Sequence, residues 1–71
     1  MQFKFVAIEC KDGEPIKVSR PHREWDEALT EVFWWCDPTD DQKEDIRETM
    51  EHNGRHTDGG YEYYILEQPD A

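Results

Sequence analysis

Four carboxylates recur between residues 40 and 53 at a spacing that an α-helix turns into one line. They step by three, four and three residues, and at about 100° per residue such steps stay on one side of the helix axis. At about 1.5 Å per residue the line is about 15 Å long, with one carboxylate in roughly every 5 Å. Carboxylates accept charge-assisted hydrogen bonds from Lys and Arg, so the line suits a basic partner. Its members are Asp41, Glu44, Glu48 and Glu51.

The single sign of this line has two interpretations. A solvated helix face accounts for its polarity, and Lys43 and Arg47 at the flank can neutralise part of its charge. Like charges three or four residues apart cost roughly a few tenths of a kcal/mol each, however, and alternating Glu and Lys would solubilise the helix without this penalty. The alternative is that the carboxylates replace a row of phosphates, because a groove that follows a nucleic-acid backbone offers Lys and Arg at similar spacing.

A tryptophan marks a second candidate contact face on residues 25–36. The apolar positions there step by three and one, which predicts an amphipathic helix, and Trp34 falls about 180° away from Trp25. One interpretation is that a second helix covers Trp34 with Ile46 and Met50, since so short a chain needs its large side chains for the core. The other makes Trp34 an exposed interface anchor. The acidic residues on the same face are Glu24, Glu27 and Glu31.

The other reactive side chains do not form a recognisable site. His52 and His56, together with Cys10 and Cys36, make a nominal zinc-ligand set, but 25 residues lie between the two cysteines. Classical zinc fingers place them about two to four residues apart. Nothing in the sequence brings a cysteine beside a histidine for nucleophilic catalysis, and no glycine-rich phosphate loop occurs. We therefore expect no enzyme activity, no metal and no cofactor.

The carboxylate line and the tryptophan face are predicted to lie on two helices that pack on a sheet. A strand is predicted over residues 3–10, where both alternating sets of side chains are largely apolar. Asp12 and Gly13 then predict a tight hairpin to an edge strand around residues 16–18. After a glycine-containing turn, alternation over residues 61–67 predicts a third strand.

Capping signals predict where the helices begin and end. Pro21 suits the first turn of the first helix, with Ser19 or Arg20 as its cap. A capping box over residues 39–42 predicts the start of a second helix near residue 40. Gly54 is suited to end that helix in the left-handed conformation.

The predicted fold is α+β in the order ββααβ, with a three-stranded sheet in the order 2-1-3 and both helices on one face. The long crossover through the helices predicts that the last strand runs parallel to the first. We expect a single small domain over residues 1–71 with a frayed tail at 68–71. Helices on one face leave apolar side chains of the sheet to face water or a second subunit. The candidates are some of Phe3, Phe5, Tyr61, Tyr63 and Ile65.

The charge balance excludes one large class of partner. The chain has 8 Lys and Arg against 18 Asp and Glu, a formal net charge of −10 at pH 7. Because nucleic acid and anionic lipid repel such an acidic surface, we expect the chain to bind neither of them directly. The sequence has no run of 18 apolar residues and no signal-peptide pattern, and two cysteines used as small apolar side chains suit a reducing compartment. These features predict a cytoplasmic protein.

Together these features predict an acidic inhibitor that occupies the basic nucleic-acid-binding surface of a partner protein. In size and charge balance the chain resembles DNA-mimic inhibitors made by phages and mobile elements, which implies an anti-defence role. It is similar in the same respects to acidic antitoxins and immunity proteins that plug basic nucleases. The alternative is a small structural or regulatory homodimer, formed through the open face of the sheet, whose acidity serves only solubility.

Overall fold

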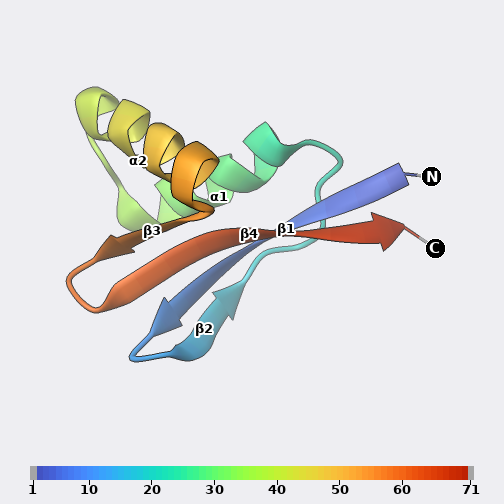
Figure 1. Ribbon diagram of the computed structural model, residues 1–71, viewed down its shortest axis with the longest axis horizontal. Coiled ribbons are helices and arrows are strands. Elements are labelled where there is room, and N and C mark those ends of the chain that lie inside the picture. The colour runs from blue at the N-terminus through green and yellow to red at the C-terminus, as the bar shows by residue number, and fades with distance from the viewer. Residues whose placement is uncertain (1, 71) are drawn as a thin grey trace.

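The computed structural model describes residues 2–70, with side chains for residues 3–69. Their class is α+β, as predicted, and both helices lie on the same side of one sheet (Figure 1). Within the described residues, no helix combines the length and the apolar composition that crossing a membrane requires. In chain order the elements are β1 (Gln2–Lys11), β2 (Glu14–Val18), α1 (Trp25–Cys36), α2 (Asp40–Asn53), β3 (Arg55–Asp58) and β4 (Tyr61–Asp70).

The sheet has four strands in the order β2-β1-β4-β3, and each neighbouring pair is antiparallel. The prediction of three strands with a parallel last pair is therefore wrong. The helical crossover does return the chain in the direction of β1, but the strand it delivers is β3. Gly59 and Gly60, with φ of +54° and +88°, then form a two-residue turn that sends β4 back between β3 and β1. The predicted order 2-1-3 corresponds to β2-β1-β4.

The end of the chain belongs to the sheet. β1 and β4 pair from Lys11↔Tyr61 to Gln2↔Asp70, so residues 68–70 are strand where the sequence predicted a frayed tail. The reason is that β1 begins at residue 2 and offers a partner for each of these positions. The last residue of the predicted tail, 71, lies outside the described residues.

The core fills the space between the sheet and the helices. Ala7 of β1 and Tyr63 of β4 meet Leu29 and Val32 of α1, and α2 adds two further buried side chains. Those two are Ile46 and Met50.

The opposite face of the sheet carries no helix. Its buried members are Val6, Ile8 and Cys10, with Tyr64 packed against them. Of the five candidates for outward-facing side chains, Phe3 is exposed, whereas the other four pack against the helix side of the core and were wrong candidates. Those four are Phe5, Tyr61, Tyr63 and Ile65.

The helix α2 has the predicted ends. Thr39 is its N-cap, where the Gln42 amide donates to Thr39 Oγ1 at 3.3 Å and the Thr39 amide donates to Gln42 Oε1 at 2.9 Å. Gly54 closes the helix at φ +79°.

The helix α1 begins later than predicted, with Glu24 as its N-cap. Ser19 is not available to cap it, because its hydroxyl accepts a hydrogen bond from the Ala7 amide at 2.9 Å. The His22 and Phe5 backbones also exchange two hydrogen bonds, of 2.7 and 2.8 Å. The segment before α1 thus continues along β1, and the prediction of a helix start at Pro21 is wrong.

Candidate protein-binding face

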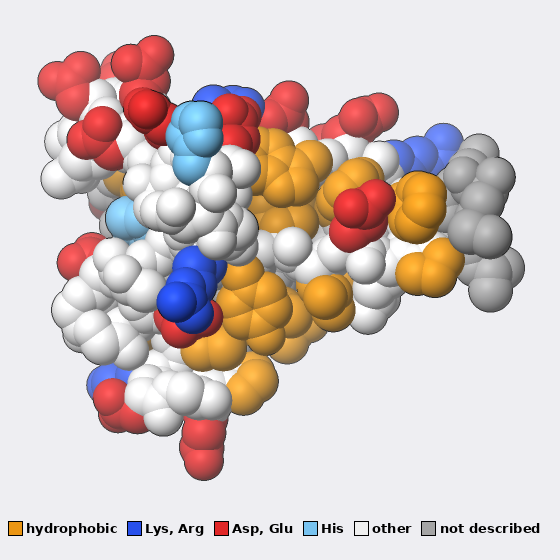
Figure 2. Space-filling view, viewed as in Figure 1, with side chains coloured by type: hydrophobic (Ala, Val, Ile, Leu, Met, Phe, Trp, Pro, Cys, Tyr) orange, Lys and Arg blue, Asp and Glu red, His pale blue; other side chains and the backbone are white. Residues whose placement is uncertain are grey.

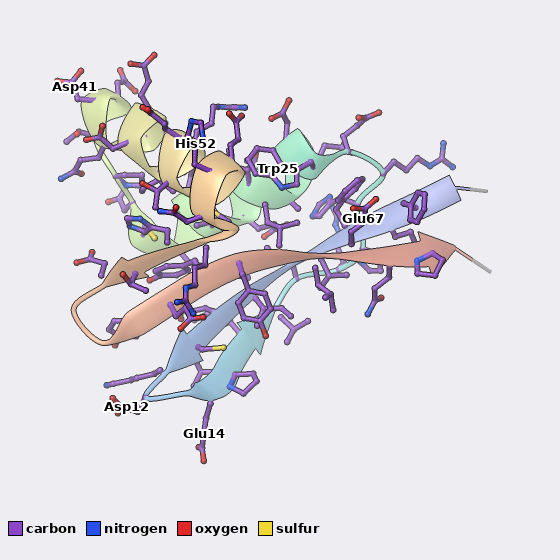
Figure 3. All side chains as sticks on the ribbon, in the orientation of Figure 1. Asp12, Glu14, Trp25, Asp41, His52 and Glu67 are labelled. Atoms are coloured by element: carbon purple, nitrogen blue, oxygen red, sulfur yellow. The ribbon has the colours of Figure 1, made fainter. Side chains whose placement is uncertain are left out.

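The outer side of α2 carries most of the predicted carboxylate line in the open. Asp41, Glu44 and Glu48 are exposed, and among residues 2–70 none of them makes an ion pair. Figure 3 shows Asp41 at the start of α2, pointing away from the sheet. Glu51, the fourth member, lies 3.9 Å from the guanidinium of Arg47. Three consecutive members of the line therefore face water without a cation from the described part of the chain beside them.

The two cations of α2 face α1 instead of crossing this line. Arg47 Nη1 is 2.6 Å from Asp26 Oδ1, and its guanidinium lies over the Trp25 ring. Lys43 Nζ lies over the Phe33 ring, 5.8 Å from its centroid. Arg47 also approaches Glu51 at the end of the row, and Lys43 also pairs with Asp40, but neither cation pairs with Asp41, Glu44 or Glu48. Figure 2 shows Asp and Glu side chains gathered along the edge of the molecule that α2 forms.

The three glutamates predicted for the second contact face also serve the fold. Glu24 is the N-cap of α1, and Glu27 Oε1 accepts a hydrogen bond from the Glu24 amide at 3.2 Å. Glu31 Oε1 lies 3.2 Å from His22 Nε2 and is half-buried. Ten residues of helix, about 15 Å, separate Glu24 from Trp34, so the predicted face is spread along the whole of α1.

Trp34 is the most exposed large apolar side chain of the described residues, at 83%. The interpretation that Ile46 and Met50 cover it is wrong, because both are buried in the core. The reason is that α2 packs beside α1 and leaves the outer side of α1 open. Trp34 lines a groove of about 520 Å³ at the corner between the helices. The other lining residues are Thr30, Phe33, Asp37, Pro38 and Lys43.

A buried polar cluster, formed by Glu9, Cys36 and Tyr63, lies at the inner side of the last turn of α1. It was not predicted from the sequence. Glu9 is only 3% exposed, and its Oε1 lies 3.7 Å from Lys17 Nζ on β2. Burial, with hydrogen bonds to Cys36 and Glu9, raises the pKa of the Tyr63 hydroxyl well above its ordinary value. Burial also raises the pKa of the Cys36 thiol. The available signal was that Glu9 alternates in phase with Phe5 and Ala7, which places a carboxylate on the core side of a strand.

The side chains considered as zinc ligands are not assembled. Cys10 lies on the open face of the sheet, whereas Cys36 packs on the helix side, and both are free thiols. His52 is exposed on α2, and His56 stacks on Tyr63 with ring centroids 6.2 Å apart. Over residues 2–70, no group of three or more His, Cys, Asp and Glu side chains is placed to hold a metal ion.

The structure therefore brings together two of the predicted features at one corner of the molecule. Trp34 lies in the last turn of α1 and Asp41, the first carboxylate of the line, lies in the first turn of α2, with only residues 37–39 between the helices. Glu24 and Glu27 lie at the other end of α1. Comparison of the chain with protein-family models, with curated proteins and with solved structures finds no match.

Proposed function

We propose that this chain is an acidic inhibitor that occupies the basic nucleic-acid-binding surface of a partner protein, as a DNA mimic of the anti-defence type does. The observation that carries the proposal is the open row of Asp41, Glu44 and Glu48 on α2, which Lys43 and Arg47 of the same helix leave unpaired. A helix that needed only a solvated face would gain from mixing the two signs of charge.

The physical basis of the inhibition is exclusion. A groove that binds nucleic acid presents Lys and Arg to phosphates, and exposed carboxylates on a rigid helix offer such groups an alternative set of acceptors. The net charge of −10 steers encounter with a basic surface, so association is fast and weakens with salt. While the chain is bound, nucleic acid is kept out of the same groove.

The test reverses two charges in the row. The variant Glu44→Lys/Glu48→Lys changes the net charge from −10 to −6. Its matched control, Glu14→Lys/Glu67→Lys, makes the same change at exposed positions that lie away from Asp41 (Figure 3). Each variant and the original chain are immobilised and exposed to a lysate cleared of nucleic acid. Bound proteins are eluted by a salt ramp and identified. Every captured protein is then assayed for DNA binding with and without the chain.

The expected result is that the original chain and the control capture a basic protein, which duplex DNA displaces, and that they inhibit its DNA binding. The Glu44→Lys/Glu48→Lys variant should bind it about tenfold more weakly or worse. Equal capture by the two variants would contradict the proposal, and so would a captured protein whose DNA binding is unaffected. An antitoxin or immunity protein for a basic nuclease would use the same contacts, and the identity of the captured protein distinguishes that role.

A second candidate function is a structural or regulatory homodimer formed through the open face of the sheet. Val18 and Leu66 on this face are 63% and 40% exposed, beside the buried Val6 and Ile8. Sedimentation velocity from 5 to 500 µM tests it, on the order of the range in which weak dimers dissociate. A monomer throughout would contradict this candidate, whereas a dimer that Val18→Lys/Leu66→Lys disrupts would support it.

A further inference from the structure

The two ends of α1 carry the same pair of side-chain types, a tryptophan and an aspartate. At the N-terminal end, Trp25 and Asp26 share one cation from α2. The guanidinium carbon of Arg47 lies 6.0 Å from the centroid of the Trp25 ring, while Arg47 Nη1 is 2.6 Å from Asp26 Oδ1. The molecule thus contains one completed site in which an arginine lies over an indole and pairs with the adjacent carboxylate.

At the C-terminal end of α1, within residues 3–69, neither the tryptophan nor the aspartate is paired with a cation, although Lys43 lines the same groove. Trp34 and Asp37 line the groove at the helix corner. Among residues 2–70, no Lys or Arg lies over the Trp34 ring, and the ammonium of Lys43 lies over Phe33. The charge of Lys43 is also offset by Asp40, whose Oδ1 is 3.8 Å from its Nζ.

The electrostatics of this groove favour a positive ligand. The last turn of α1 carries no basic residue, so its negative dipole end is not neutralised from within the helix. Its C-cap is Asp37 at φ 50°, in the left-handed region where glycine is the usual residue. A carboxylate is therefore held beside a helix end whose dipole disfavours it. Carboxylate and dipole together present negative charge beside an exposed indole.

We infer that this groove receives an arginine side chain of the basic partner, with the guanidinium stacked on Trp34 and donating hydrogen bonds to the Asp37 carboxylate. The inference rests on the proposed function, whose partner it describes more closely. Arginine fits better than lysine, because a planar, weakly hydrated guanidinium stacks on an indole and presents its donors as a fork. The apolar walls formed by Phe33 and Pro38 accept the methylene stem of the arginine.

The test compares two peptides that differ only in the cation. A hexa-arginine and a hexa-lysine peptide are titrated against the full chain at about 0.15 M salt. We expect the arginine peptide to bind more tightly, and Trp34→Ala to weaken it about two- to fivefold without changing the affinity for the lysine peptide. Trp34→Phe should retain part of the preference. In NMR spectra, the arginine peptide should shift the indole N–H signal of Trp34 and leave that of Trp25 in place.

Three results would overturn the inference. They are an arginine preference that survives Trp34→Ala, an arginine preference retained by Trp34→Leu, and an arginine affinity unchanged by Asp37→Asn. The second would show a plain apolar contact instead of stacking. Because Trp34 is exposed, these variants should keep the fold, which circular dichroism verifies. The inference and the proposed function can fail separately. Glu44→Lys/Glu48→Lys should lower the affinities for both peptides and keep the ratio of the two affinities. The Trp34 variants should lower only the affinity for the arginine peptide, and so change that ratio.

Discussion

The two ends of α1 differ in how they satisfy a tryptophan. Trp25 packs against the core and is covered by the guanidinium of Arg47, whereas Trp34 is exposed to water. At the N-terminal end, Trp25 and Asp26 therefore both contact Arg47 and hold α2 against α1. The C-terminal end has equivalent groups that the fold does not use. The difference shows that the fold uses the aromatic and the carboxylate at one end of α1 and leaves those at the α1–α2 corner available for a partner.

The largest expected difference between the two ends is in stability. Trp25→Ala removes a side chain that packs on the core cluster, so it should lower the free energy of unfolding by at least about 2 kcal/mol. Trp34→Ala should change it by less than about 0.5 kcal/mol, because the side chain is exposed. Urea denaturation followed by circular dichroism measures both. Comparable losses in the two variants would show that Trp34 also serves the fold.

The inner side of the last turn of α1 should respond to alkaline pH. Burial raises the pKa values of Cys36 and Tyr63 above their ordinary values of 9.0 and 10.0, so near and above those values the folded state binds more protons than the unfolded state. The stabilisation they give is complete below pH 9 and falls as the pH rises, by at most about 1.4 kcal/mol per pH unit for each group. Urea denaturation between about pH 7.5 and pH 10.5 measures this decline.

Tyr63→Phe provides the control for this pH dependence. Without the hydroxyl, the Tyr63 contribution is lost while those of Cys36 and Tyr64, whose pKa values burial also raises, remain, so the decline above pH 10 should be shallower than in the original chain. The stability at pH 7.5 should fall, because Tyr63 is buried and its hydroxyl is hydrogen-bonded to the cluster. An identical decline in both proteins would mean that Tyr63 titrates in the same way in its folded and unfolded states.

The elements with local signals were predictable from the sequence. The capping box and Gly54 define α2 within single residues, and the spacing of its carboxylates fixes which of them share a side. β3 was missed because its four residues, Arg55–Asp58, are polar and show no apolar alternation. Gly59 and Gly60 were a hairpin signal that required such a strand, but they were interpreted only as a turn. Missing this one short strand reversed the predicted direction of β4.

The candidate site depends on longer-range geometry that the sequence left open. Whether Trp34 is covered depends on the side from which α2 packs, and neither helix encodes that choice by itself. The position of Arg47 was predicted at the flank of the carboxylate line, but its contact with Asp26 joins residues that lie 21 apart. The capture of Ser19 and His22 by β1 is likewise a tertiary contact, and it overrides the local signal of Pro21 for a helix start.

A smaller loss of stability is expected when Arg47 is removed from its site on Trp25 and Asp26. Arg47→Met keeps most of the apolar stem but removes both the pair with Asp26 and the cation over Trp25, so it should cost about 0.5–1 kcal/mol, since both charged groups are partly exposed. Lys43→Met, which removes a 3.8 Å pair with Asp40 and a cation over Phe33, is the matched change and should cost less. Thermal unfolding ranks the two. Equal losses would remove the distinction between a completed site and an ordinary surface pair.

The smallest expected effect has the opposite sign. Asp37→Asn preserves the shape of the C-cap, and asparagine tolerates the left-handed conformation, while the substitution removes a negative charge from the negative end of the α1 dipole. Stability should therefore rise by about 0.3 kcal/mol at low salt, and the gain should shrink as salt screens the dipole. The same variant should bind the arginine peptide more weakly. A residue whose replacement improves the fold and impairs binding is not there for stability, whereas a loss in both measurements would assign Asp37 to the architecture of the helix corner.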